Sequence, residues 1–184
     1  MEQGVTRVNG AALATADSSA SPSVRIVNFI AIEETGMVFF ANSNSGKIQQ
    51  IDVNPRASLC FYWPVLQEQA IVEGRVERAG NEASGAYWEK VPREKHFYKS
   101  IEKEAVNLVR YGGLKDAVTE QWSQSGFTAI DRPMDWHAFL IKPDQIEFWR
   151  SGWRRAKERI RYSKKMMNSG TKNYSLFELG RNVK

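Results

Sequence analysis

The pattern of apolar and polar residues predicts a chain that begins and ends in strands and is helical in the middle. Residues 24–32 form a nearly continuous apolar, β-branched run, which is typical of a strand buried on much of both faces. Residues 68–80 alternate instead, with mostly polar side chains on one face. The other face consists of Ala70, Val72, Gly74 and Val76. This second segment is predicted to cover a core with one side only.

Five strands and one helix are predicted in the first half of the chain. The strands span residues 11–17, 24–32, 37–42, 56–63 and 68–80. The helix begins at Asn44 or Ser45, either of which can cap it, and ends before Pro55. This order predicts a mainly β fold with an antiparallel barrel, closed or partly closed, because closure removes exposed strand edges.

The middle of the chain is predicted to be helical, and the last third returns to strands. The helices span residues 81–91, 93–113 and 114–126, and the strands span 136–143, 144–149, 159–163 and 173–179. No internal repeat, low-complexity linker or change in composition divides the chain. The simplest organisation is one domain, residues 1–184.

Composition and the length of the apolar runs indicate the class of protein and its expected location. The hydrophobic fraction of 42% and the charged fraction of 26% are ordinary for a globular protein in water. A single cysteine, Cys60, excludes an intrachain disulfide framework and a cysteine-cluster metal site. The amino terminus lacks the apolar region of a secretion signal, and no apolar run reaches the length of a membrane span. We therefore expect a cytoplasmic protein without a membrane partner.

The positive charge is concentrated near the carboxyl end. Eight basic residues and one acidic residue lie between positions 150 and 165, whereas the chain as a whole carries a net charge of +5. The rest of the chain is therefore slightly acidic, which argues against an extended nucleic-acid surface. In a strand, Arg155, Lys157, Arg159 and Arg161 would share one face. The segment thus favours a local anion site over a nucleic-acid partner.

Common catalytic and metal-binding motifs are absent from the sequence. His96 and His137 are far apart and neither has a second ligand at motif spacing, so no metal is expected. Nucleotide-binding glycine motifs and the nucleophile motif G-x-S-x-G are missing. The acidic pair Glu33 and Glu34 lies in a predicted turn and is interpreted as solvated. If the protein is an enzyme, a bound cofactor supplies the chemistry.

Three polar positions are candidates for holding an anionic ligand. Arg25 lies inside an apolar strand and needs a partner, because burying a charge alone is costly. An edge position or an internal salt bridge explains it equally well. Lys47 begins a helix after small polar residues, as in a phosphate site, although any capped helix looks similar. Near Arg159, an aromatic platform with Trp149 adjoins guanidinium groups that suit a planar anion.

Taken in order, these segments resemble the pyridoxine (pyridoxamine) 5′-phosphate oxidase family. The likeness covers residues 12–162. It rests on the segments "SVRIV", "GMVFFANSNSGK", "QIDVNPRASLCFYW", "QAIVEGRVER" and "DQIEFWRSGWRRAKERIRY". The resemblance implies an FMN-binding split β-barrel, antiparallel and Greek-key-like, with peripheral helices. It also implies a homodimer with two FMN sites at the subunit interface.

The resemblance assigns the cofactor-binding residues by position. Arg25 and Lys47 correspond to the ligands of the FMN phosphate, and Gln69 contacts the ring system from the second subunit. The other flavin-contacting positions are Trp149 and Arg159, the strand residues Ile26, Val27 and Asn28, and the pair Phe40 and Ala41. Two positions depart from the family pattern: Gly46 replaces a second basic residue, and Phe40–Ala41 replaces a Tyr–Thr pair.

The substrate-binding positions depart further from the family. The family holds a phosphate with Lys, Tyr, Arg and Ser, and this chain has Ile30, Tyr87, Val91 and Lys95 there. The family's Arg-Leu-His segment over the substrate is Arg155, Ala156 and Lys157 here. The resemblance therefore implies a substrate site with Tyr87, Lys95, Arg155 and Lys157, and a weakened grip on phosphate. No side chain is assigned as a catalytic residue.

Three hypotheses about function follow. The first is an FMN-dependent oxidase that transfers a hydride from a reduced nitrogen heterocycle or cyclic amine to flavin and then to O2, giving H2O2. Its small-molecule substrate would be carboxylated, as for the phenazine-biosynthesis relatives. The second is a pyridoxine/pyridoxamine 5′-phosphate oxidase that grips phosphate with Arg93 and Lys95. The third is a non-catalytic flavin- or haem-binding split barrel, in which His96 or His137 would bind haem iron.

Overall fold

The computed structural model describes residues 10–92, 96, 131–152 and 155–164, and the side chains of residues 152 and 155–157 are not among those described. In this part of the chain, seven strands and two helices occur. The strands are β1 (Gly10–Ala16), β2 (Pro22–Glu33), β3 (Gly36–Asn42), β4 (Arg56–Trp63), β5 (Glu68–Arg78), β6 (Trp136–Gly152) and β7 (Arg155–Ser163). The helices are α1 (Gly46–Val53) and α2 (Asn81–Trp88).

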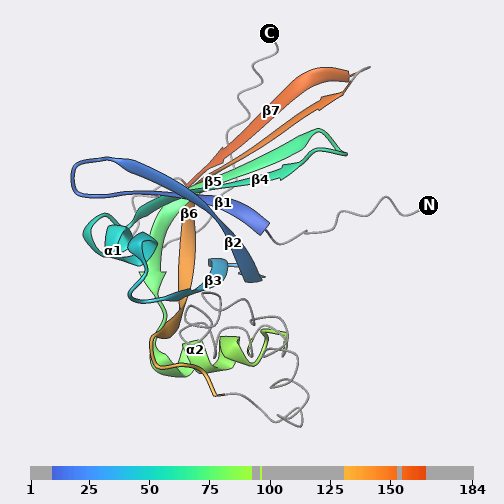
Figure 1. Ribbon diagram of the computed structural model, residues 1–184. Coiled ribbons are helices and arrows are strands. Elements are labelled where there is room, and N and C mark those ends of the chain that lie inside the picture. Colours follow the sequence, from blue (N-terminus) through green and yellow to red (C-terminus); the bar gives the residue numbers. More distant parts are fainter. Residues whose placement is uncertain (1–9, 93–95, 97–130, 153–154, 165–184) are drawn as a thin grey trace, which may run out of the picture.

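The strands form one antiparallel sheet that closes on itself. Their order is β3-β2-β1-β4-β5-β6-β7, and β3 also pairs with β6, which closes a barrel of six strands. Strand β7 lies outside this ring and pairs only with the second half of β6, residues 145–152. Figure 1 shows the β4–β5 and β6–β7 hairpins projecting from the barrel. We call the part of the sheet formed by β7 and the facing halves of β5 and β6 the arm.

The mainly β barrel expected from the sequence is confirmed, with element bounds shifted by a few residues. One expectation is wrong: residues 136–143 and 144–149 are not two strands but parts of the single strand β6. Pro143 suggested the break, because proline cannot donate to a ladder. The structure places Pro143 opposite Gly74 at a register shift, where Asp144 is an extra residue of a β-bulge. The predicted segments 93–113, 114–126 and 173–179 lie outside the described residues.

Two hydrophobic clusters stabilise the barrel. The larger fills its interior, and its fully buried members include Leu13, Phe39, Leu59, Phe139 and Ile141. Helix α1 closes this interior with Ile48 and Ile51. The smaller cluster packs α2 against the outside of β3 and β6. Its buried members are Val38, Phe40, Trp88, Val91 and Ala138. Of the helices described here, neither is long and apolar enough to cross a membrane.

The close approach of β5 and β6 at the bulge predicts that any larger residue in place of Gly74 destabilises the fold. A Cβ on Gly74 would lie 2.1 Å from the carbonyl oxygen of Lys142, a backbone atom that cannot move aside cheaply. We expect Gly74→Ala to lower the free energy of unfolding by about 2–3 kcal/mol in chemical denaturation. Gly85→Ala in α2 is the control, since no atom lies within 4 Å of its Cβ. It should raise stability by roughly 0.5–1 kcal/mol, and equal stability of both variants would contradict this account.

Candidate functional site

Three of the predicted cofactor-binding residues form one row across the arm. In the strand registers, Gln69 of β5 lies opposite Trp149 of β6, and Trp149 lies opposite Arg159 of β7. Directly opposed residues of an antiparallel pair project from the same face of the sheet. The sheet therefore brings an amide, an indole and a guanidinium together, although they are up to 90 positions apart in sequence. We call this face of the arm the ligand face.

A hollow of about 300 Å³ lies mainly on the other face of the arm, because Phe148, Arg150 and Glu158 of its lining alternate with the residues of the row along their strands. Its lining includes Gln69 and Trp149, together with the aromatic side chains of Trp63, Phe148 and Tyr162. An ion pair between Arg150 and Glu158, 2.5 Å long, also lies at its edge. The hollow is therefore separate from the ligand face, although it shares Gln69 and Trp149 with the row.

Arg25 of β2 lies at a second location, beside α1. It points to the same side of β2 as the buried Val27 and is itself partly buried. Its guanidinium donates to Thr15 Oγ1 at 2.5 Å and to Gln50 Oε1 at 3.2 Å, and also to the backbone carbonyl oxygens of Leu13 and Ser23 at 3.4 and 3.3 Å. Burial lowers the pKa of the guanidinium below its ordinary value.

These contacts orient Arg25 without neutralising its positive charge. Its partners among the described residues are all neutral oxygen atoms, so no carboxylate in this part of the chain neutralises it. Thr15 and Gln50 also bond to each other at 2.5 Å, which fixes the frame around the guanidinium. An oriented but uncompensated cation is what a phosphate site requires. The salt-bridge alternative for Arg25 therefore finds no support here.

Helix α1 brings Lys47 to the same side as Arg25. Lys47 lies in the first turn of α1, three residues before Gln50, so the two side chains share a helix face. Because Gln50 contacts Arg25, this face of α1 is turned toward β2. The first turn carries no acidic residue, and Gly46 has open space around it. Arg25, Lys47 and the amino-terminal end of α1 thus fit a phosphate group.

Sequence reasoning missed Thr15, Ser23 and Gln50 as part of this location. Gln50 also donates to Ser23 Oγ at 3.1 Å, so the three side chains and Arg25 form one hydrogen-bonded group. The helical spacing of Lys47 and Gln50 is the signal that could have identified Gln50. Thr15 becomes visible only through the register of β1 and β2, which places it opposite Ser23.

The other predicted cofactor-binding residues lie on β2 and β3. Ile26 and Asn28 face outward and are exposed, whereas the side chain of Val27 is buried. Phe40 belongs to the cluster under α2, where its ring meets Trp88 edge-on, and Ala41 is fully buried in the barrel interior. Contact of a ligand with Phe40 or Ala41 would thus involve their backbone. Their role stays a prediction.

The two locations are separated within one chain. Figure 1 shows α1, beside Arg25 and Lys47, on the left of the barrel, while β7 and the second half of β6 extend to the upper right. Segments that lie apart in one view are apart in space. The fold thus places the two locations at different parts of the sheet.

The charges of the basic segment are partly compensated where its side chains are described. Arg150 pairs with Glu158, and both Arg159 and Arg161 pair with Glu147. Glu147, just before the basic segment, was not recognised as its partner because the pairing depends on the register of β6 and β7. The side chains of Arg155 and Lys157, predicted to bind substrate, lie outside the described residues, as does Lys95.

The structure does bring together three of the four positions where the family holds phosphate. Ile30 and Tyr87 pack against the same small hydrophobic cluster in which Val91 is buried. The hydroxyl of Tyr87 donates a 2.7 Å hydrogen bond to Glu33 Oε2. This bond and burial raise the pKa of Tyr87 to about 12. Lys90 lies 3.7 Å from the other oxygen of Glu33 and over the Tyr87 ring.

The interpretation of Glu33 and Glu34 as a solvated pair is wrong for Glu33. It ends β2, accepts the hydrogen bond of Tyr87 and pairs with Lys90, so it belongs to the group around the predicted substrate position. The sequence contains no signal for this contact, because Glu33 and Tyr87 are 54 positions apart.

Both histidines are buried. The ring of His96 stacks on Trp88 at 4.1 Å, and its Nε2 lies 2.7 Å from the backbone oxygen of Trp88. Burial, together with the positive charges of Arg78 and Arg132, lowers the pKa of His137, which favours its neutral form. Within the described ranges, no group of three or more His, Cys, Asp or Glu side chains is placed to hold a metal.

The contact with Glu33 predicts an unusual titration for Tyr87. The difference in tyrosinate absorbance between the wild type and Tyr87→Phe should titrate with a midpoint near pH 12. Glu33→Gln should lower this midpoint toward the ordinary value of about 10, because it removes the negative charge that opposes ionisation. Since the folded-state pKa is raised, the hydrogen bond stabilises the fold below about pH 10 and is lost as the pH rises toward 12. A wild-type midpoint near 10 would show that the bond is not formed in solution.

Comparison with known proteins identifies the family. Residues 1–150 match the family described as pyridoxamine 5′-phosphate oxidase, and residues 136–176 match the C-terminal dimerisation region of pyridoxine 5′-phosphate oxidase. A pyridoxine/pyridoxamine 5′-phosphate oxidase of Anaeromyxobacter dehalogenans (strain 2CP-C) is 40% identical over 152 residues, which are 83% of this chain and 77% of that protein. One from Legionella pneumophila (strain Paris) is 33% identical over 150 residues, 82% of this chain and 70% of that protein.

Solved structures show the same fold. PhzG from Burkholderia lata 383, in complex with tetrahydrophenazine-1-carboxylic acid, has a TM-score of 0.70 at 24% identity and covers 85% of this chain and 77% of its own. A pyridoxamine 5′-phosphate oxidase-related, FMN-binding protein from Nostoc punctiforme PCC 73102 has a TM-score of 0.65 at 18% identity, with 88% and 83% covered. The two family matches and the 40% identical relative show that this chain belongs to the pyridoxamine 5′-phosphate oxidase family.

Proposed function

We propose that this protein is an FMN-dependent oxidase whose substrate is a reduced nitrogen heterocycle or cyclic amine without a phosphate group. A carboxylated, phenazine-precursor-like compound is the leading candidate. The family consists of FMN-dependent oxidoreductases, so oxidase chemistry and the cofactor follow from membership. The substrate class does not follow from membership and has to be inferred from the residues of this chain.

The observation that carries the proposal is the apolar character of the phosphate-holding positions. Ile30 and Val91 stand where the family has a lysine and an arginine, and both belong to one hydrophobic cluster with Tyr87. Val91 is 4% exposed, so it offers no space for a hydrated anion. A phosphate dianion placed beside this cluster would lose water without gaining the charge-assisted hydrogen bonds that normally compensate for it.

The hydrogen bond of Tyr87 adds to this effect. Its proton is directed to Glu33 and is therefore not offered to a phosphate oxygen. The carboxylate of Glu33 places a negative charge next to the position where the phosphate would lie, and Lys90 compensates it only from a half-exposed site. The phenolic oxygen can still accept a hydrogen bond. The group therefore suits a neutral or N–H-bearing substrate better than a phosphorylated one.

The two separated locations fit a homodimer with FMN at the subunit interface. Arg25 and Lys47 of one copy would hold the phosphate, and the row of Gln69, Trp149 and Arg159 from the other copy would contact the ring system. In support, residues 136–176, which match the family's dimerisation region, include Trp149 and Arg159. A single copy holds these locations on different sides of the barrel (Figure 1).

In the reaction, FMN when bound accepts a hydride from the substrate and returns the electrons to O2 as H2O2. The chain's own contribution is positioning and electrostatics. Arg155 and Lys157 would orient a substrate carboxylate, since both follow the flavin-contacting Trp149 on the arm. The hydrophobic cluster beside Tyr87 would exclude water from the apolar side of the substrate. The structure of PhzG with tetrahydrophenazine-1-carboxylic acid, a phosphate-free carboxylate, supports this substrate class.

The second candidate is a pyridoxine/pyridoxamine 5′-phosphate oxidase. The 40% identity to a protein of that name favours it. In this case Arg93 and Lys95 would rebuild the phosphate grip, and they lie outside the described residues. The two candidates differ in one measurable property, which is the contribution of a phosphate group to catalytic efficiency.

Comparing phosphorylated and phosphate-free substrates tests the proposal. We expect the purified, FMN-loaded protein to oxidise pyridoxamine 5′-phosphate with a much lower kcat/KM than a dihydrophenazine carboxylate, followed by H2O2 formation. The variant Ile30→Lys/Val91→Arg restores both family cations and should raise kcat/KM for pyridoxamine 5′-phosphate at least tenfold, since each charge-assisted bond contributes about 1.5–3 kcal/mol. Efficient turnover of pyridoxamine 5′-phosphate by the wild type would instead establish the second candidate.

The affinity for FMN tests the role of Arg25. Arg25→Gln should raise the Kd for FMN by roughly 10- to 100-fold, because it removes a charge-assisted bond to phosphate of about 1.5–3 kcal/mol. Binding of riboflavin, which lacks the phosphate, should change little. Arg56→Gln is the control, since Arg56 is exposed and pairs with Asp144. If Arg25→Gln weakens riboflavin and FMN equally, Arg25 does not bind the phosphate.

A further inference from the structure

Glu147 is a buried carboxylate on the ligand face of the arm. It lies on β6 two residues before Trp149, so both side chains project from the same side of the strand. Glu147 is 5% exposed, although the arginines beside it are about half exposed. A carboxylate so well covered on the face of a sheet needs partners, because an unpaired buried charge is costly.

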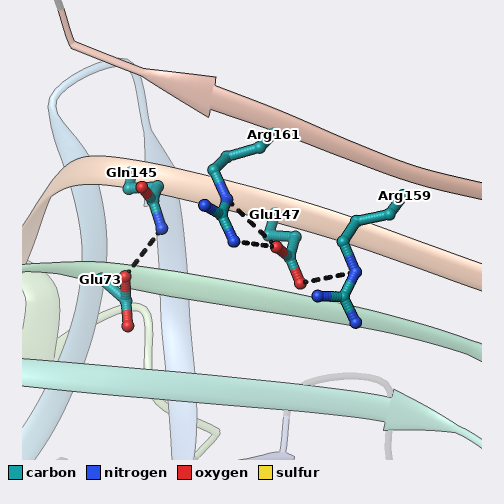
Figure 2. Close-up of polar contacts among 5 residues, drawn as sticks. All are labelled: Glu73, Gln145, Glu147, Arg159 and Arg161. Atoms are coloured by element: carbon teal, nitrogen blue, oxygen red, sulfur yellow. Dashed lines mark hydrogen bonds and ion pairs between the residues drawn. The ribbon is translucent and has the colours of Figure 1, made fainter. Parts of the chain in front are cut away.

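The partners of Glu147 are two arginines of β7. Oε2 accepts hydrogen bonds from Arg161 Nε at 3.1 Å and from Arg161 Nη2 at 2.7 Å. Oε1 lies 3.5 Å from Arg159 Nε. Figure 2 shows the carboxylate of Glu147 between the two guanidinium groups. The carboxylate thus contacts Arg161 closely and Arg159 more loosely.

This asymmetry suits different tasks for the two arginines. Arg161 uses two nitrogen atoms on one oxygen and serves to fix the carboxylate. Arg159 meets Glu147 through Nε alone, and its terminal nitrogen atoms have no hydrogen bond or ion pair within the described part of the chain. Arg159 is therefore held by one edge of its guanidinium, while the other edge remains available to a ligand beside Trp149.

The net charge of the three groups supports the same division of roles between Arg159 and Arg161. If Glu147 faced Arg159 alone, the pair would carry no net charge, and the field of Arg159 at a ligand would be largely cancelled. With Arg161 present, the three groups carry a net charge of +1. The second arginine allows the carboxylate to orient Arg159 without neutralising the face on which it acts.

We propose that Glu147 and Arg161 are positioning residues for Arg159, which they orient toward the ring system of FMN and keep positively charged. The inference rests on one part of the proposed function, the contact of Arg159 with FMN. It does not depend on the identity of the substrate. Neither residue needs to touch the cofactor for this role.

Binding of FMN to the dimer, followed by quenching of flavin fluorescence, tests the proposal without any substrate. Glu147→Gln keeps the size of the side chain and removes its charge, so Arg159 loses its anchor. We expect the Kd for FMN to rise about tenfold, the loss of one charge-assisted contact. Glu73→Gln is the matched control, since Glu73 lies on the same face but accepts its hydrogen bond from Gln145 at 2.9 Å (Figure 2). It should leave the Kd within about twofold.

A double-mutant cycle separates positioning from a general structural role. If Glu147 acts through Arg159, Glu147→Gln should have almost no further effect on the Kd in an Arg159→Gln background. A full, additive effect in that background would overturn the proposal. So would a Kd of Glu147→Gln within about twofold of the wild type.

The reduction potential of bound FMN gives a readout that a loss of packing would not produce. Glu147→Gln raises the net charge of the group from +1 to +2 and should make the potential more positive. Arg161→Leu lowers it to zero and should make the potential more negative. Shifts in the same direction would contradict the proposal. Should Glu147→Gln fail to fold, as judged by circular dichroism, Arg161→Leu decides the question by its potential and its Kd.

If the protein binds FMN as predicted but oxidises none of the proposed substrates, the substrate class is wrong and this inference stands. If Arg159→Gln itself leaves the Kd for FMN unchanged, Arg159 does not contact the cofactor and both this part of the proposed function and the inference fail.

Discussion

The structure depends on the antiparallel pairing of one long strand, β6. Its first residues pair with β3 and close the barrel, residues 139–150 pair with β5, and its second half pairs with β7. Because β5 and β6 pair on both sides of the bulge at Gly74, the arm is an extension of the barrel sheet and is held by the same strand pair. The row of Gln69, Trp149 and Arg159 exists only in this register, since a slip of one residue would turn Trp149 to the other face.

The second organising feature is the way in which arginine charges are compensated. Arg25 is held by neutral oxygens and keeps its charge, whereas Arg159 shares one carboxylate with Arg161. Both arrangements orient a guanidinium while leaving positive charge for a ligand, which fits a cofactor with a phosphate at one end and a ring system that takes up electrons at the other. At Tyr87 the situation is reversed, because the carboxylate of Glu33 and the apolar Ile30 and Val91 surround the position where the family binds phosphate. We therefore propose that the cofactor side of the site is retained and the substrate side is altered.

Most of the described fold could be predicted from the sequence, because the alternation in β5 reflects burial directly. The expectation that residues 24–32 are buried on much of both faces is wrong, since Val24, Ile26 and Ile32 are exposed and β2 covers the core with one face only. The continuity of β6 could not be predicted from the sequence, because a proline such as Pro143 is typical of a strand end. Only the bulge opposite Gly74 accommodates it within one strand. Individual cofactor positions such as Arg25 followed from an apolar context. Contacts between distant residues, including Glu33 with Tyr87 and Thr15 with Arg25, depend on strand register and were missed. The roles of Lys95, Arg155 and Lys157 stay predictions.

The central claim is that the substrate side of the site no longer recognises phosphate. Calorimetric titration of the FMN-loaded dimer with pyridoxal 5′-phosphate and with pyridoxal measures this recognition directly. Our account predicts that the two ligands bind with similar, weak affinity, because Ile30 and Val91 supply no cation and Glu33 repels an anion. Binding of pyridoxal 5′-phosphate that is 100-fold or more tighter than that of pyridoxal, which corresponds to about 2.7 kcal/mol, would contradict it.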